Sequence, residues 1–457
     1  MSFRKFRSSH LRDQDGTFLY RLRAHCQWSK LKSTIDEYTK QGTILSDNYN
    51  ARIDGLTTGL GKVQSRFVRD LIEGISRAKS LRLSKIGEAL HEEIPLHATH
   101  KRLSRNLADN HIGQFLMSRI LELEATKVTK DTRIVLDQFS IIKRFATKME
   151  FIEEIKSEDT PGMGYRMCEV LISDTGSGAY RPLTFALWSR NAPEYTSDRD
   201  QIMALIRQVQ DAGANQGTFI LNASLGATLG GGDSDDSDDV LTSLATESTA
   251  DFIIRLYGER NLTYRQHCEP VRDLAKHCNL LYSRSVFKYK ADQEKQYCLQ
   301  YGYIPVTLPE APDRKLSLVV VRCDGYETVG RPAFYYLLTS MPMRRNQQVL
   351  WRIVEAYTTR WQVICSNRLV HEKFCLHDLR VLTYDRIKNL AALTLATHSS
   401  YSDDISGLPL TARGLTYKRR YQAPPAITKA KVQTVVRRSP DYGLSFPNIA
   451  QTLVKLS

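Results

Sequence analysis

The sequence predicts an α/β protein: a mixed sheet flanked by helices, with an N-terminal helical domain, a β-rich insertion and a basic C-terminal tail. Three observations lead to this fold class. Apolar residues recur with helical spacing between residues 33 and 125. From about residue 130 the pattern changes to short apolar runs separated by turn residues, which is typical of strands. A long helical pattern returns from Asn346 to about His371.

Length and composition limit the classes of protein that the chain can belong to. At 457 residues it is long enough for about three domains. Its longest apolar run, near Leu316 to Val321, is far shorter than the ~20 residues of a membrane-spanning helix. The basic N-terminus has no apolar stretch behind it, so we expect no secretory signal. None of the eight cysteines forms a CxxC pair, which favours a reduced, cytoplasmic protein.

The net charge of +14 is concentrated at the two ends of the chain. Residues 1–32 hold eight Lys/Arg and two Asp, a net of +6, and residues 411–457 hold nine Lys/Arg and one Asp, a net of +8. These two arms account for the whole excess, since 6 + 8 = 14. Charge gathered in this way indicates contact with a polyanion, and nucleic acid is the best candidate.

The N-terminal domain, residues 1–125, is expected to be helical. Residues 65–80 place four apolar side chains on one stripe among basic residues. Residues 83–90 and 97–105 then read as a short helix, a turn and a basic helix, an order that resembles a helix-turn-helix. Small helical bundles share this pattern, so DNA contact through this segment is one of two interpretations.

An α/β core is expected over residues 126–224 and 341–400. Arg133 to Asp137 reads as a buried strand that ends in an acid. Strands at 168–173 and 182–188, an amphipathic helix at 201–212 and a strand at 217–222 follow. The basic tail, residues 401–457, shows little periodicity.

Residues 225–340 are expected to hold an acidic loop and a β-rich insertion. The loop contains the aspartate cluster of residues 233–239. A divalent ion could bind there, but the segment lacks the glycine turn and the distal glutamate of an EF-hand loop, so we favour a solvated loop. The doublets His267-Cys268 and His277-Cys278 match no common zinc module, and we expect no zinc site.

Several segments, in this order, resemble the RNase H-like core of the bacterial insertion-sequence DDE transposases. The closest branch is the one whose last catalytic helix carries a Tyr-x2-Arg-x3-Glu-x6-Lys signature. The resemblance covers roughly residues 130–400, and its segments are Leu136-Asp137, Pro182 to Ser189, Phe252 to Leu262, Tyr357 to Val363 and Leu376 to Val381. It implies an RNase H-like fold and a mobile-element origin.

The resemblance also implies a chemistry. Enzymes of this class cleave phosphodiesters with two divalent ions, Mg²⁺ in the family, held by three acids. Asp137 stands at the position of the first acid and is the candidate metal ligand. The second position is Asn222, and the third is Ile364 in the last helix. His371 stands at the position of the family's lysine.

Three interpretations remain open. The favoured one is a domesticated transposase descendant that binds DNA ends or sites and has lost cleavage, because one carboxylate cannot hold two Mg²⁺ ions. The second is an active transposase that uses displaced acids in cut-and-paste transposition. It would combine Asp137 with Glu372 and with one of Asp233, Asp235, Asp236 or Asp251. The third is an unrelated nucleic-acid binder or assembly factor on the same fold.

Double-stranded DNA is the expected partner. Phosphate contacts come from basic side chains and do not depend on metal ligands. The resemblance further implies a homodimer, and a cytoplasmic, nucleoid-associated location in a bacterial cell. The candidate contacts are Lys101, Arg102, Arg105, Arg255, Arg260, Tyr357, Arg360, Arg380, Lys418, Arg419 and Arg420. For Arg360 a structural ion pair, with Glu355 or a strand carboxylate, is the alternative.

Overall fold

The computed structural model describes residues 47–143, 146, 148–155, 162–174, 180–222, 240–290, 293–324, 333–344, 346–374 and 376–406. The two basic arms, including Lys418, Arg419 and Arg420, lie outside the described residues. So does the aspartate cluster at 233–239, with Asp233, Asp235 and Asp236.

The described chain begins with the expected helices. They are α2 (Asp47–Thr57), α3 (Lys62–Ala78), α4 (Leu83–Leu90), α5 (Leu96–Asn106) and α6 (Asn110–Ala125). The apolar stripe of α3 is fully buried, and the helix ends at Lys79 in a left-handed conformation. Gly74 allows α4 to pack closely on α3, because a Cβ atom there would lie 2.5 Å from Ile86 Cγ2. The pair α4 and α5 occupies the segment that resembles a helix-turn-helix.

Twelve strands of the described chain form one sheet, and its first half has mixed strand directions. The strands of this half are β1 (Thr132–Ile142), β2 (Glu153–Ile155), β3 (Gly162–Asp174), β4 (Tyr180–Trp188), β5 (Thr218–Leu221) and β6 (Phe252–Leu256). β3 pairs antiparallel with β1, β2 and β4, whereas β1, β5 and β6 run parallel to one another. The expected mixed sheet flanked by helices is therefore confirmed.

One expected boundary is wrong. The strand that carries Asp137 does not end there but continues to Ile142. The reason is that β3 is long enough to pair with all of β1, from Thr132 opposite Asp174 to Ile142 opposite Gly164. Asp137 therefore lies in the middle of a paired strand rather than in a loop beyond it.

The strands between residues 251 and 340 extend the same sheet. β12 (Ala333–Thr339) pairs with β6, β11 (Ala311–Asp324) with β12, and β10 (Gln293–Leu308) with β11. β9 (Tyr282–Lys290) forms an antiparallel ribbon with β10. The smaller elements here are β7 (Asn261–Tyr264), β8 (His267–Pro270), α9 (Val271–Leu274) and η4 (Ala275–His277).

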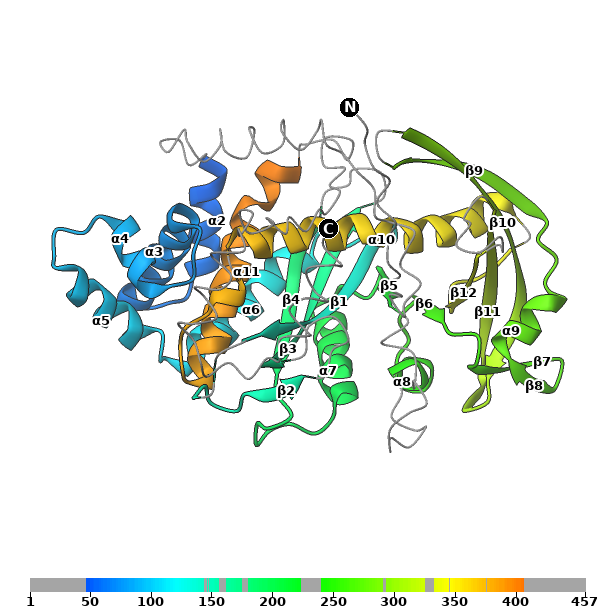
Figure 1. Ribbon diagram of the computed structural model, residues 1–457, viewed down its shortest axis with the longest axis horizontal. Coiled ribbons are helices and arrows are strands. Elements are labelled where there is room, and N and C mark those ends of the chain that lie inside the picture. The colour runs from blue at the N-terminus through cyan, green and yellow to red at the C-terminus, as the bar shows by residue number, and fades with distance from the viewer. Residues whose placement is uncertain are drawn as a thin grey trace, which may run out of the picture. The chain divides into compact units, whose positions relative to one another are not determined.

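Helices cover the two faces of the sheet (Figure 1). α7 (Asp198–Asp211) and α8 (Val240–Glu247) share a hydrophobic cluster with Ile134 and Leu136 of β1. α10 (Gln347–Lys373) packs with Val135 on the other face and contacts β1, β5, β6 and β10. Because side chains alternate along a strand, Asp137 shares the face of Val135 and lies beneath α10.

The last described elements are η5 (Leu376–Asp378) and α11 (Tyr384–Ser406), which joins the helical part to the sheet. α11 packs against α2, α3, α6 and β4. Its buried Asn389 donates hydrogen bonds to the carbonyls of Leu107 (2.9 Å) and Asp109 (2.7 Å), and its Oδ1 accepts one from Gly113 N (2.9 Å). Within the described residues, no helix is both long and apolar enough to cross a membrane.

Candidate functional site

Two buried carboxylates lie side by side beneath α10. Asp137 of β1 pairs in register with Glu169 of β3. The two residues are 4% and 0% exposed, respectively. Two carboxylates buried next to each other repel and lose hydration, so each needs a compensating positive charge or must take up a proton.

α10 provides the compensating groups. His371 Nε2 lies 2.8 Å from Glu169 Oε2, and Asn367 Nδ2 donates a hydrogen bond to the same oxygen. Asn367 and His371 are four residues apart, a spacing that places both on one face of the helix. The Arg368 guanidinium lies 3.6 Å from Asp137 Oδ1. Each carboxylate therefore faces a positively charged or donating side chain of the same helix.

The shifted pKa values follow from this arrangement. Burial alone would raise the pKa of Glu169, but the charge and hydrogen bond of His371 outweigh it, and the pKa is lowered. Burial alone would lower the pKa of His371, but Glu169 raises it. Both shifts favour the ionised pair, His371⁺ with Glu169⁻. Burial raises the pKa of Asp137, and the half-exposed Arg368 offsets this only in part.

A second histidine lies behind this pair. His398 of α11 is 3% exposed, and its ring makes an edge contact with Tyr180, with 5.3 Å between ring centroids. Burial, together with the positive charge of His371, lowers the pKa of His398 to about 3. His398 therefore stays neutral beside a charged histidine.

Asn222, at the family's second acidic position, lies level with Asp137. β1 and β5 are parallel, with Arg133 opposite Thr218 and Val135 opposite Ile220. Two residues further along each strand are Asp137 and Asn222. The Asn222 side-chain oxygen accepts a hydrogen bond from Arg360 at 2.9 Å.

Arg360 is enclosed by the protein. It is 1% exposed, it donates a hydrogen bond to the Tyr357 hydroxyl at 2.8 Å, and its guanidinium carbon lies 4.4 Å from the centre of the Tyr357 ring. Tyr357 is itself 5% exposed. In this conformation neither side chain offers a surface to DNA. The expected structural partner Glu355 instead faces Arg133, at 3.5 Å.

Among the described residues, neither the family's third position nor the alternative acids Glu372 and Asp251 complete a site. Ile364 is 3% exposed and packs in the apolar cluster that contains Val135 and Ile220. Glu372 is exposed. Asp251 precedes β6, whereas Asn222 follows the parallel strand β5, so these two residues lie at opposite ends of the sheet.

The residues present do not fit a pair of Mg²⁺ ions. Asp137 Oδ2 and Glu169 Oε1 are the buried carboxylate oxygens here that accept no hydrogen bond. Their neighbours from α10 are donors and cations, which repel a divalent ion. Across the part of the chain that the structure describes, no three His, Cys, Asp or Glu side chains are grouped so that they could hold a metal ion.

The candidate DNA contacts on α5 fall into two groups. Lys101 and Arg105 are exposed. Arg102 is held between Asp70 at 2.8 Å and Glu92 at 2.6 Å, and these two ion pairs join α5 to α3 and to the turn after α4. Its guanidinium therefore serves the packing of the helices.

The other candidate contacts lie in the sheet and after α10. The Arg255 guanidinium lies over the Tyr335 ring, 5.0 Å from its centre. Arg260 is 11% exposed at its side chain and pairs with Glu310 at 3.2 Å. Arg380 is 63% exposed and pairs with Asp378 at 3.1 Å. Of these three, only Arg380 presents most of its side chain to the solvent.

Four residues of the site were not predicted from the sequence: Glu169, Asn367, Arg368 and His398. A signal for Glu169 existed, since it is the single acid in an apolar run from 168 to 172, and such an acid must find a partner if the strand is buried. The identity of that partner depends on where a helix two hundred residues later crosses the strand. No local sequence pattern indicates where that helix crosses the strand.

Comparisons with known proteins complete the description. No protein-family model matches the chain, and no curated protein matches it. Among solved structures, the chain is similar to a piggyBac transposase, determined by cryo-electron microscopy as a synaptic complex with hairpin DNA. The two chains are 9% identical, the match covers 85% of this chain and 82% of that one, and the TM-score is 0.35.

Proposed function

We propose that this chain is a transposase-like DNA-binding protein in which an internal charge network has replaced the cleavage site. One observation carries the proposal: the two carboxylates at the centre of the candidate site, Asp137 and Glu169, face Arg368 and His371 where a catalytic site would need divalent ions. The protein would bind DNA ends or sites and would not cut them.

The strand order supports an RNase H-like core. Three antiparallel strands, β4, β3 and β1, are followed by the parallel strands β5 and β6, and α10 packs across them. The register places Asp137 and Asn222 level on adjacent strands, as the family's first two acids would be. The third position, Ile364, is on α10 and packs over the same strands.

The balance of charge supports the loss of cleavage. Asp137 and Glu169 contribute up to two negative charges, and Arg368 and protonated His371 contribute two positive ones. Two Mg²⁺ ions would add four positive charges that no side chain of the site offsets. Burying uncompensated charge costs several kcal/mol per ion, so metal binding should be very weak.

Cleavage is tested by incubating the full chain with supercoiled plasmid and with linear duplex DNA in the presence of Mg²⁺ or Mn²⁺. We expect no metal-dependent nicking by the wild-type protein. Asp137→Ala and the exposed control Asp211→Ala should be equally inactive. Nicking by the wild type that Asp137→Ala abolishes and Asp211→Ala retains would establish the alternative, an active transposase.

DNA binding is proposed to reside in the basic arms and in the exposed face of α5. Affinity for duplex DNA should fall steeply with salt, because several phosphates are neutralised. Removing residues 1–32 or 411–457 should reduce the slope of log affinity against log salt. An unchanged slope in both truncations would contradict the assignment to the arms. Such binding would place the protein on the nucleoid of a bacterial cell. The homodimer is a separate proposal, and sedimentation of the DNA complex would test it.

A further inference from the structure

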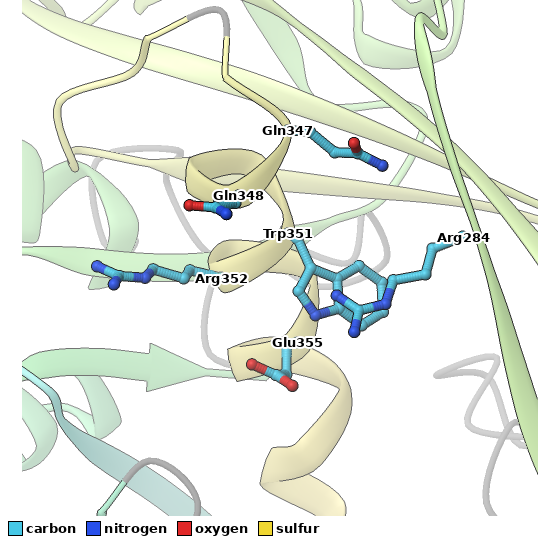
Figure 2. A pocket seen from close by; sticks show the side chains of 6 residues that line it. All are labelled: Arg284, Gln347, Gln348, Trp351, Arg352 and Glu355. Carbon is cyan, nitrogen blue, oxygen red and sulfur yellow. The ribbon is translucent and has the colours of Figure 1, made fainter.

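A cavity of about 540 Å³ lies beside the N-terminal half of α10 (Figure 2). Its volume is within the usual range for ligand sites. Five of its lining residues come from α10 and one from β9, and they are Gln347, Gln348, Trp351, Arg352, Glu355 and Arg284. None of them belongs to the buried cluster around Glu169.

A row of aromatic rings, tilted to one another by 45° and 35°, ends in this cavity beside a guanidinium. The Arg284 guanidinium carbon lies 4.2 Å from the centre of the Trp351 ring. Behind Trp351 the row continues with Tyr301, 5.9 Å away, and then Tyr282, a further 6.1 Å away. In Figure 2 the guanidinium lies across the indole. A guanidinium is planar, so both of its faces can stack on rings. An aromatic base could therefore stack on the face that points away from Trp351 and extend the row.

The cavity also has a surplus of positive charge. Arg284 and Arg352 are both exposed. Among the lining residues that the structure describes, the one carboxylate is Glu355, and it faces Arg133 at 3.5 Å. α10 begins at Gln347, so the positive end of a 27-residue helix adds to the potential. An anionic group is therefore favoured next to a planar one.

Neutral hydrogen-bonding groups complete the lining. Gln347 and Gln348 are exposed, and a side-chain amide can both donate and accept. Gln347 Nε2 donates a hydrogen bond to the Ser283 carbonyl at 3.4 Å. An amide of this kind can pair with the edge of a nucleobase, which presents donors and acceptors side by side. These groups match three features of a nucleotide. The stacking surface suits the face of the base, the cations suit the phosphate, and the amides suit the edge of the base.

We propose that this cavity binds one unpaired nucleotide, with the base stacked on Arg284 over Trp351 and the phosphate at Arg352. The nucleotide is either free in solution or part of a single strand, because the same chemistry recognises both. The proposal does not depend on the loss of cleavage. It adds a single-strand or nucleotide site to a protein proposed above to bind duplex DNA through its arms.

The test uses the full 457-residue chain in two experiments. In the first, a labelled single-stranded oligonucleotide is titrated with the wild type, Trp351→Ala, Gln348→Ala and Arg352→Gln. Arg207→Gln, an exposed arginine on α7, is the matched control for lost charge. In the second, intrinsic tryptophan fluorescence is followed as dAMP or dTMP is added to the wild type and to Trp351→Phe.

We expect Trp351→Ala to weaken single-strand binding about tenfold or more, which is the usual effect of removing a stacking partner. Gln348→Ala and Arg352→Gln should each weaken it about threefold, and Arg207→Gln less than twofold. Gln348 is exposed, so its substitution tests the cavity even if Trp351→Ala perturbs the fold. Quenching by a free nucleotide that is lost in Trp351→Phe would identify free nucleotides as the source. Absence of quenching together with the strand effect would identify an unpaired position in a strand.

The proposal is overturned if free nucleotides leave the fluorescence unchanged and the three cavity variants bind the oligonucleotide as Arg207→Gln does. Duplex binding measured in parallel separates the two proposals. Normal duplex affinity with no cavity effect would remove the nucleotide site and leave the proposed function intact. Loss of duplex binding in the arm truncations would not alter the cavity result.

Discussion

The two halves of α10 use polar side chains in opposite ways. In the C-terminal half, Arg360, Asn367 and His371 are almost fully buried, and each contacts a partner from the sheet or from the helix itself. In the N-terminal half, Gln348 and Arg352 are exposed beside a cavity. Burial thus separates the two groups: the buried side chains contact partners inside the protein, whereas the exposed ones line the proposed nucleotide site.

The largest effect is expected from breaking the buried pair. Glu169→Leu should lower the free energy of unfolding by about 3–5 kcal/mol, because it leaves the His371 charge and the Asn367 amide without their acceptor. Urea denaturation measures this. The double variant Glu169→Leu/His371→Leu should recover part of the loss. A loss below about 1 kcal/mol in the single variant would show that the pair contributes little.

Arg360 should behave as an interior residue. Arg360→Met should cost about 2–3 kcal/mol of stability, because Asn222 and the Tyr357 hydroxyl lose a buried donor. Duplex DNA affinity at a temperature where the variant is folded should stay within twofold of the wild type. A large loss of affinity with little loss of stability would return Arg360 to the list of DNA contacts.

The neutral His398 predicts a loss of stability in acid. Its pKa is about 3 in the folded protein, below the ~6.5 of an unfolded histidine, so the unfolded state binds the proton first. Stability should therefore fall as the pH drops below about 6.5, by about 2 kcal/mol at pH 5. The stability that His371 contributes is fully present below pH 6.5, because its pKa is raised in the folded protein. The stability that Glu169 contributes is present down to about pH 4.5, because its pKa is lowered in the folded protein.

His398→Leu should reduce the loss of stability between about pH 6.5 and pH 5. The comparison is urea denaturation at pH 7 and pH 5, with the exposed His111→Leu as the control. His111→Leu should keep the wild-type slope. Equal slopes in His398→Leu and wild type would mean that His398 is not the group responsible.

The smallest effects are expected from the basic residues of α5. Here too, an arginine held in ion pairs lies next to exposed basic side chains. Lys101→Ala and Arg105→Ala should each weaken duplex binding a few-fold, because each removes an exposed cation from the proposed DNA-binding face. Arg102→Ala should instead lower stability by about 1 kcal/mol, through lost ion pairs with Asp70 and Glu92. Filter binding and urea denaturation on the same preparations separate the two. Identical behaviour of the three variants would contradict the division between buried and exposed charge.

Periodicity predicted much of the fold but little of the site. The strands β4 and β5 and the long helix α10 lie close to where their apolar patterns place them, because those patterns are local. β3 covers its expected segment but begins earlier, at Gly162 rather than at Cys168. The end of β1 was placed at Asp137 because the sequence of one strand does not indicate how long its partner strand is. Asp137 and Asn222 were singled out by their positions in the segments that resemble the transposase core, whereas Arg360 was assigned to DNA because sequence alone cannot tell which turns of α10 are covered.

The hydrogen bond between Asn222 and Arg360 has a consequence for the proposed loss of cleavage. An Asn222→Asp change would place an acid at that position, yet the new carboxylate would meet a guanidinium and form an ion pair. Under the proposed function, this variant should melt at a higher temperature and should not cut DNA. On the same proposal, cleavage would require coordinated changes at Asn222, Arg368 and Ile364.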